Sequence, residues 1–381
     1  MPDRRSRPPA NLLAAVLLGV FLGATAPALG DESDRSSPQA AYRAFLEVDR
    51  RYQRQVREFL LVGVVEIHRD AFASMATPSR LAKFDALIRR RKEQVGEREP
   101  RWEVEFDAAP AAGGESVTFD LARVHFRKVL APGGRVRETA SRRKERLTYV
   151  REDGEWRIQN RTLACLACAG TGKSESGDPC YDCAGAGYVE DRFGRIPGLP
   201  LPPREALELV EGELTTAETA VRAYLVRSQV AYARVMEGYA QLIGQALEDF
   251  HPFFSAEVNG RLSARWTEVQ EGGREAFAGI RTDFDKIDEE PDGSRVRATV
   301  WARRPTVEGE TRDERLRLQF VATEGEWRLD REDPACDACE AAGVCPRCSG
   351  IGKNAEGETC LFCRGDGRCR TCRGEGYVNE E

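Results

Sequence analysis

The chain is poor in histidine and methionine, with three of each among its 381 residues. So few histidines make histidine-based catalysis and histidine-rich metal sites poor expectations. Positive charge is not in excess either: 57 lysines and arginines stand against 63 aspartates and glutamates, which disfavours a general nucleic-acid-binding protein. Hydrophobic residues make up 41% of the chain, enough to bury sizeable cores. At about 150 residues per domain, the length predicts two or three domains.

Residues 1–30 have the composition of a secretory signal peptide. Three arginines precede an apolar run over residues 12–26, and small residues follow at Ala28 and Gly30. We expect cleavage after Gly30, so that the mature chain begins at Asp31 and is exported, either to a periplasm or to the medium. An uncleaved anchor is the alternative, but the run is shorter than the ~20 residues that span a bilayer. We expect no stable membrane span in the mature chain.

The chain contains an internal repeat. Residues 40–46 resemble residues 219–225, and residues 154–158 resemble residues 325–329. In both copies the first cysteine follows the tryptophan of the second segment by nine positions. We interpret the chain as a duplication, with one copy at residues 38–164 and the other at residues 205–335. Four prolines among residues 197–203 predict a stiff linker at residues 190–204.

Each copy is expected to begin with helix and continue as antiparallel sheet, which is an α+β arrangement. Apolar residues recur at helical spacing near the start of each copy, at positions 45, 48, 52, 56 and 59, and at positions 221, 224, 232, 235, 239 and 242. Later segments alternate between apolar and polar residues, as half-buried strands do. Asp153 and Gly154 predict the hairpin turn before the last strand of the first copy.

This order of elements, closed by the recurring Gly-Glu-Trp-Arg strand, resembles the nuclear-transport-factor-like fold over residues 38–161 and 215–330. The resemblance implies helices packed in the hollow of a curved sheet, a cone that in this family can host a ligand or an active site. We assign no pocket and no catalytic residue. His68, His125 and His251 do not recur at matching places in the two copies, so we expect them to be structural or exposed.

All twelve cysteines fall into six Cys-x-x-Cys pairs. Such a pair places two thiolates on one side of a tight turn, and two turns supply the four sulfurs that a tetrahedral zinc ion prefers. Twelve cysteines therefore predict about three zinc ions. The ligands form three sets: Cys165, Cys168, Cys180 and Cys183; Cys345, Cys348, Cys360 and Cys363; Cys336, Cys339, Cys369 and Cys372.

The grouping follows from spacing. Eleven residues separate Cys168 from Cys180 and also Cys348 from Cys360, which predicts two similar hairpins. The pairs Cys336/Cys339 and Cys369/Cys372 remain for an outer site, and each lies five residues from the inner hairpin. Joining pairs in sequence order instead would close turns only five residues apart on one ion, which is sterically tight. We therefore expect a zinc hairpin at residues 165–189 and a nested ribbon at residues 336–378.

Five of the six pairs continue as x-Gly-x-Gly. The motif Cys-x-x-Cys-x-Gly-x-Gly resembles the cysteine-rich zinc domain of DnaJ-type chaperones, over residues 165–187 and 336–376. That family also joins its first motif to its fourth and its second to its third, and the resemblance implies an unfolded or extended polypeptide as partner. The chain has no His-Pro-Asp tripeptide, so no J-domain is expected. The pair Cys336/Cys339 departs from the motif, and we interpret its glycine as displaced to Gly343.

The recurring end of each cysteine segment suggests how the two differ. Residues 183–189 resemble residues 372–378, so the outer pairs of the second copy correspond to the two pairs of the first. We interpret the second copy as the first with a further hairpin inserted between its turns.

Three functions remain open at this point. The first is a non-enzymatic, exported zinc protein with structural metal sites and a polypeptide partner. The second is a thiol–disulfide oxidoreductase or isomerase, and an even cysteine count in an exported chain also allows structural disulfides. The third is a ligand binder or enzyme acting in one of the cones. The sequence favours the first, because bonded Cys-x-x-Cys pairs form strained rings and the glycine pattern suits metal-binding turns.

Overall fold

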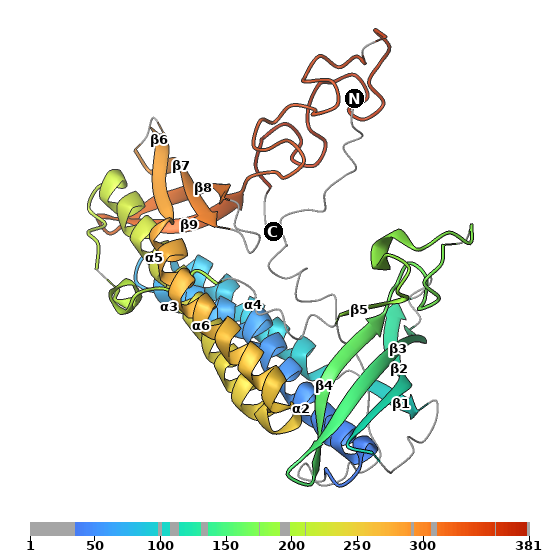
Figure 1. The fold of residues 1–381 in the computed structure, drawn as a ribbon. Coiled ribbons are helices and arrows are strands. Elements are labelled where there is room, and N and C mark those ends of the chain that lie inside the picture. Colours follow the sequence, from blue (N-terminus) through green and yellow to red (C-terminus); the bar gives the residue numbers. More distant parts are fainter. Residues whose placement is uncertain are drawn as a thin grey trace.

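The computed structural model describes residues 35–97, 101–106, 114–130, 136–174, 176–190, 199–209, 211–290, 293–305, 311–354 and 356–378. The predicted signal peptide and residues 191–198 of the predicted linker lie outside the described residues. The described chain consists of helices and two antiparallel sheets, which confirms the α+β class (Figure 1). Within these ranges, every helix is too short or too polar to cross a membrane.

Two long helical segments run through the molecule. The first is continuous through three elements, α2 (Pro38–Glu58), the π-helical turn η1 (Phe59–Gly63) and α3 (Val64–Phe72), and α4 (Pro78–Glu97) follows it. The second is α5 (Ala217–Phe250), preceded by η4 (Arg204–Leu207) and followed by η5 (His251–Phe253) and α6 (Ala256–Ala278). The hydroxyls of Ser37 and Thr216 accept hydrogen bonds from backbone N–H groups in the first turns of α2 and α5, so both helices begin at equivalent caps.

Each half of the chain contributes one sheet whose strands are paired in sequence order. The first sheet contains β1 (Arg101–Phe106), β2 (Ser116–Leu130), β3 (Val136–Glu152), β4 (Glu155–Ala164) and the short β5 (Tyr188–Glu190). The second contains β6 (Arg281–Glu289), β7 (Arg295–Pro305), β8 (Thr311–Thr323) and β9 (Glu326–Pro334). The predicted turn at Asp153 and Gly154 joins β3 to β4, and both residues have positive φ, as tight hairpin turns require.

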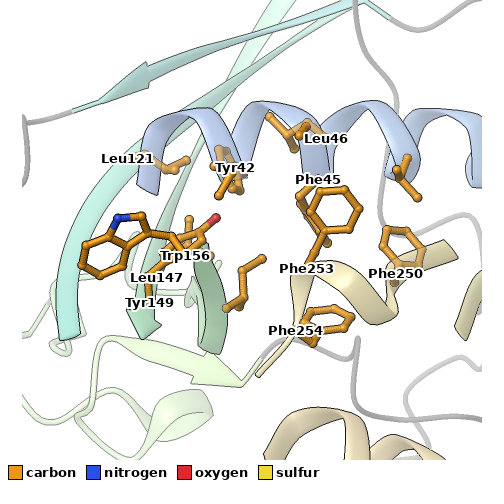
Figure 2. Close-up of a cluster of buried hydrophobic side chains, with 14 of the residues drawn as sticks. Tyr42, Phe45, Leu46, Leu121, Leu147, Tyr149, Trp156, Phe250, Phe253 and Phe254 are labelled. Atoms are coloured by element: carbon orange, nitrogen blue, oxygen red, sulfur yellow. The ribbon is translucent and has the colours of Figure 1, made fainter. Parts of the chain in front are cut away.

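The two largest hydrophobic clusters among the described residues, called here the first and the second core, each contain residues from the two halves of the chain. Figure 2 shows the first core, where Phe45 of α2 faces Phe250 at the end of α5, with ring centroids 5.4 Å apart. In the second core, Phe72 at the end of α3 stacks on Tyr224 near the start of α5, at 5.0 Å. Each long helical segment therefore begins on the sheet of its own half and ends on the sheet of the other.

Backbone hydrogen bonds hold the end of each long helical segment against the sheet of the other half, an arrangement that we call the exchange of helix ends. The N–H of Thr77, just before α4, donates to the carbonyl of Leu329 in β9 at 2.8 Å. At the equivalent place, the N–H of Ser255, just before α6, donates to the carbonyl of Ile158 in β4 at 3.0 Å. A division of the chain at residues 190–204 consequently separates residues that share a core.

The two cores differ in polarity. Arg123 of β2 is buried, and its guanidinium lies 3.0 Å from Glu145 of β3 and 3.4 Å from Asp49 of α2. Burial raises the pKa of Glu145, but the charges of Arg123 and Arg161 outweigh burial and lower the pKa to about 2. The tyrosine hydroxyl of Tyr42 also donates to Glu145, at 2.9 Å. The corresponding strand positions of the second sheet carry Ala302 and Leu316, so the described part of that sheet has no counterpart of the Arg123–Glu145 ion pair.

The histidines that the structure describes lie away from any metal-binding group. His68 in α3 is partly buried and stacks on Phe72, at 6.2 Å between ring centroids. Burial and the positive charge of Arg304 lower its pKa to about 4, so its imidazole is neutral near pH 7. His251 is exposed at the end of α5. The side chain of His125 lies outside the described residues.

Candidate metal centres

One cysteine-rich segment follows the last long strand of each sheet. We call residues 165–189, after β4, module 1, and residues 336–378, after β9, module 2. All twelve cysteines are buried, and their sulfurs converge in three groups of four, each group with all sulfurs within 4.8 Å of one another. Module 1 holds Cys165, Cys168, Cys180 and Cys183. Module 2 holds an outer group, Cys336, Cys339, Cys369 and Cys372, and an inner group, Cys345, Cys348, Cys360 and Cys363.

The sulfur–sulfur distances fit a tetrahedral metal site. In module 1 the sulfurs of Cys165 and Cys180 are 3.9 Å apart, and those of Cys168 and Cys183 are 3.7 Å apart. Four sulfurs at ~2.3 Å from a central zinc ion lie ~3.8 Å from one another. A disulfide needs ~2.05 Å, far less than these separations. The inner and outer groups of module 2 show the same pattern, with sulfur–sulfur separations of 3.6–4.0 Å.

Backbone N–H groups point at the sulfurs and favour their thiolate form. Gly172 donates to the sulfur of Cys168 at 3.3 Å, and Gly187 donates to that of Cys183 at 3.2 Å. Burial raises the pKa of the Cys168 thiol, but the N–H groups of Gly172 and Gly170 and the neighbouring thiols of Cys183 and Cys165 outweigh burial and lower the pKa to about 6. In the same group, burial dominates at Cys180 and raises its pKa to about 11. Four buried sulfurs with donors of this kind suit a soft divalent cation.

The second glycine of each motif allows the two turns of a module to approach closely. A side chain at Gly172 would overlap the carbonyl oxygen of Gly185, and one at Gly187 would overlap that of Gly170. The first glycine has a different role. Gly170 has a φ of 88°, but a Cβ there would make only ordinary contacts, the nearest at 3.4 Å. Positive φ at this position suits glycine, whereas close backbone approach at the second position demands it.

The departure from the motif at Cys336/Cys339 is a substitution, and the expectation of a displaced glycine is wrong. Gly343 occupies the same place as Gly172, because its N–H donates to the sulfur of Cys339 at 3.3 Å. Ala341 stands where the other motifs have their first glycine, and it has a φ of 67°. The metal site is retained because position 341 requires a positive φ, which alanine can adopt, and has room for a side chain.

Hydrogen bonds show how the hairpins of the two modules correspond. The N–H of Cys165 donates to the carbonyl of Gly187 at 2.9 Å, and the N–H of Cys336 donates to that of Gly376 at 2.8 Å. The outer group of module 2 thus has the hydrogen-bonding frame of module 1, and the inner group shares it, since the N–H of Cys345 donates to the carbonyl of Gly367 at 2.8 Å. The inner hairpin begins at the bridge between Val344 and Arg368, the position where Lys173 and Pro179 close the hairpin of module 1.

Each module is fastened to its sheet by an arginine stacked on a tyrosine. The guanidinium of Arg146 in β3 lies 4.3 Å from the ring centre of Tyr188, and that of Arg317 in β8 lies 4.9 Å from the ring centre of Tyr377. Comparing the two copies in sequence identifies the tyrosines as part of a recurring segment but gives no sign of their partners. The arginines sit at matching places in the two sheets, and only the strand register reveals that match.

The arrangement supports a structural metal site. Four cysteine thiolates fill the coordination positions of zinc and leave none for water or substrate. A metal bound in this way supplies folding energy to a segment that has few apolar residues of its own to bury. About three zinc ions per chain therefore fit the three groups.

Comparison with known proteins adds little. No family model matches the chain, and no curated protein matches it. One solved structure, titled "Ntf2 like protein involved in plasmid conjugation", matches 73% of this chain and 96% of its own chain, with 11% sequence identity and a TM-score of 0.12. A likeness at that identity and TM-score carries no argument about this protein.

Proposed function

We propose that this chain is an exported, non-enzymatic zinc protein in which about three structural zinc ions shape two DnaJ-type modules that bind unfolded or extended polypeptide. The observation that carries the proposal is the convergence of twelve buried cysteines into three groups of four at tetrahedral spacing. Export rests on the signal-like composition of residues 1–30. The two α+β units, in our interpretation a duplicated nuclear-transport-factor-like fold, act as the scaffold that holds the modules.

The structure offers less support for the other two functions. A thiol–disulfide oxidoreductase needs an accessible attacking sulfur, whereas each of the twelve cysteines is less than 9% exposed. A ligand binder needs a roomy cavity. Among the described residues, the second core has a cavity lined by residues that include Tyr224, Arg304 and Glu314, and its volume of roughly 20 Å³ holds about one water molecule.

The proposal is tested on the purified mature protein with three measurements. Elemental analysis should find about three zinc ions per chain, and thiol titration should find no reactive thiol until a chelator is added. A reduced, unfolded model protein such as carboxymethylated lactalbumin should then bind the zinc-loaded chain, and its folded form should not. Chelation should abolish the binding, because the modules lose their shape without metal.

The structural zinc sites and the polypeptide partner can be disproved separately. Zinc-free protein that reduces insulin disulfides would overturn the structural zinc sites and favour the oxidoreductase. Zinc-loaded protein that ignores unfolded chains would leave the metal sites standing and overturn the polypeptide partner.

A further inference from the structure

Large apolar side chains on the surface are concentrated on the cysteine modules. Among the described residues, those exposed to solvent are Leu166, Tyr181, Val226, Val344, Ile351, Leu361 and Phe362, and all but Val226 belong to the modules. Tyr181 is 97% exposed and Leu361 is 91% exposed. Exposed apolar residues gathered in this way mark interaction sites, since scattered single ones are expected elsewhere on a surface.

One exposed apolar residue of each of two hairpins occupies an equivalent place. Tyr181 directly follows Cys180, and Leu361 directly follows Cys360. The outer group of module 2 provides an internal comparison, because Arg370 holds the same position after Cys369. The metal-binding turn thus accepts a charged residue there, and its geometry does not explain the apolar ones. Only the hairpin of module 1 and the inner hairpin of module 2 carry them.

The charges of the two modules differ locally. Module 1 has one lysine and three acidic residues between Cys165 and Cys183. The equivalent stretch of module 2, between Cys345 and Cys363, has one arginine and one lysine against two glutamates, and four arginines and one aspartate follow between residues 364 and 373. Within the part of the chain that the structure describes, Arg364, Arg368 and Arg370 form no ion pair. A partner that contacts both modules is therefore expected to be basic where it meets module 1 and acidic where it meets the arginines between residues 364 and 373 of module 2.

The fold places both modules on the same side of the helical layer. Each module follows the last long strand of its sheet, and the exchanged helices hold the two sheets at opposite ends of that layer (Figure 1). The arginine–tyrosine contacts at Tyr188 and Tyr377 fasten each module to its sheet. A single chain thereby holds both modules, each with exposed apolar residues, on one side of the helical layer.

We infer that the two modules bind one extended polypeptide at two points, with the pair Leu166 and Tyr181 as one contact and the pair Leu361 and Phe362 as the other. This rests on the proposed function and adds that the binding is bivalent. Two weak contacts on one chain raise the affinity because the second contact forms within the complex, where its effective concentration is about millimolar. Each contact by itself stays weak and releases its segment readily.

The test uses synthetic peptides with apolar clusters of leucine and phenylalanine. One peptide carries a lysine-flanked cluster, a second carries a glutamate-flanked cluster, and a third joins both through Gly/Ser linkers of increasing length. At the linker length that spans the modules, we expect the joined peptide to bind about 100-fold more tightly than either single peptide. Isothermal titration calorimetry on the zinc-loaded full chain measures all three.

Substitutions assign the two contacts. The double variant Leu166→Ser/Tyr181→Ser, or Leu361→Ser/Phe362→Ser, should return the joined peptide to the affinity of one single peptide. Val226→Ser, which changes the exposed apolar residue of α5, is the matched control and should change nothing. Zinc content shows that each variant keeps its modules, since the replaced side chains point to solvent.

The possible results separate the two levels of the proposal. Single peptides that bind, with no gain from any linker, would overturn bivalent binding and leave the proposed function intact. Peptides that do not bind at all would overturn both. If sedimentation shows that the chain pairs with its own copies and the substitutions abolish that pairing, the partner is a second copy and the inference is wrong.

Discussion

At the scale of single residues, the two glycines of each cysteine motif differ in what they contribute. Gly172 lies where any side chain would overlap the carbonyl of Gly185, while Gly170 has room but a positive φ. Ala341 shows that an alanine is tolerated at the first position, because it keeps the left-handed backbone there. The cost of such a backbone for a residue other than glycine is ~1 kcal/mol.

We therefore predict different results for two matched variants of module 1. Gly172→Ala should force the two turns apart and lose one zinc ion per chain, since the overlap is with backbone and cannot be relieved by a side-chain rotation. Gly170→Ala should keep all zinc ions and lower the stability of module 1 by ~1 kcal/mol. Zinc content and chelator titration distinguish the two. Equal zinc loss in both variants would contradict the assignment of separate roles.

At the scale of elements, module 2 nests one metal-binding hairpin inside another. The outer group joins Cys339 to Cys369, and the residues between them include the whole inner hairpin. Once the inner site is formed, the loop that the outer site must close shrinks to residues 340–344 and 364–368. The entropy cost of loop closure grows with the logarithm of loop length. The shorter loop therefore stabilises the outer zinc site by ~1 kcal/mol, or about fivefold in affinity.

Emptying the inner site should therefore weaken the outer one. We expect Cys348→Ser/Cys363→Ser to leave two zinc ions per chain, one of them held about fivefold more weakly than in the intact protein. The control is Cys168→Ser/Cys183→Ser, which empties the independent site of module 1 and should leave the other two affinities unchanged. Competition with a chromophoric chelator measures both variants. If the outer site bound zinc with the same affinity in both variants, the two sites of module 2 would be independent.

At the scale of the whole molecule, the exchange of helix ends makes the two halves one folding unit. The first core takes Phe250 and Phe254 from the second half, and the second core takes Phe72 and Met75 from the first. The buried pair of Arg123 and Asp49 can form only where α2 meets the first sheet. Because the second sheet carries Ala302 and Leu316 at the corresponding positions, this network favours packing of α2 on the first sheet.

Cutting the chain within residues 191–198 tests whether the two halves fold only together. Each half alone lacks several large aromatic residues of its core, and the loss of one such side chain costs ~3–5 kcal/mol, so neither half should fold as a monomer. The two halves expressed together should associate and recover a single cooperative transition. Circular dichroism on heating, with mass from light scattering, provides the measurement. A half that melts cooperatively as a monomer would show that the cores are separable.

The sequence by itself determined the local features of this protein. Hairpin turns, strand alternation and the two metal hairpins depend on residues close in the chain, so spacing predicts them. The outer group of module 2 joins cysteines 33 residues apart, and it was predicted because its two pairs are the ones left once the inner hairpin is assigned. The equivalence of Gly343 with Gly172 was missed because Ala341 hides the motif, although its spacing from Cys339 is the same.

Tertiary structure decided which sheet each helix end packs against. The apolar spacing of Phe45, Tyr52 and Phe59 is the same whether the helix stays on its own sheet or crosses to the other, so periodicity carries no information about the exchange. The stacking of Arg146 on Tyr188 likewise depends on strand register. Contacts between residues distant in the chain are chosen by shape and charge complementarity in the folded state, and these are absent from any local pattern.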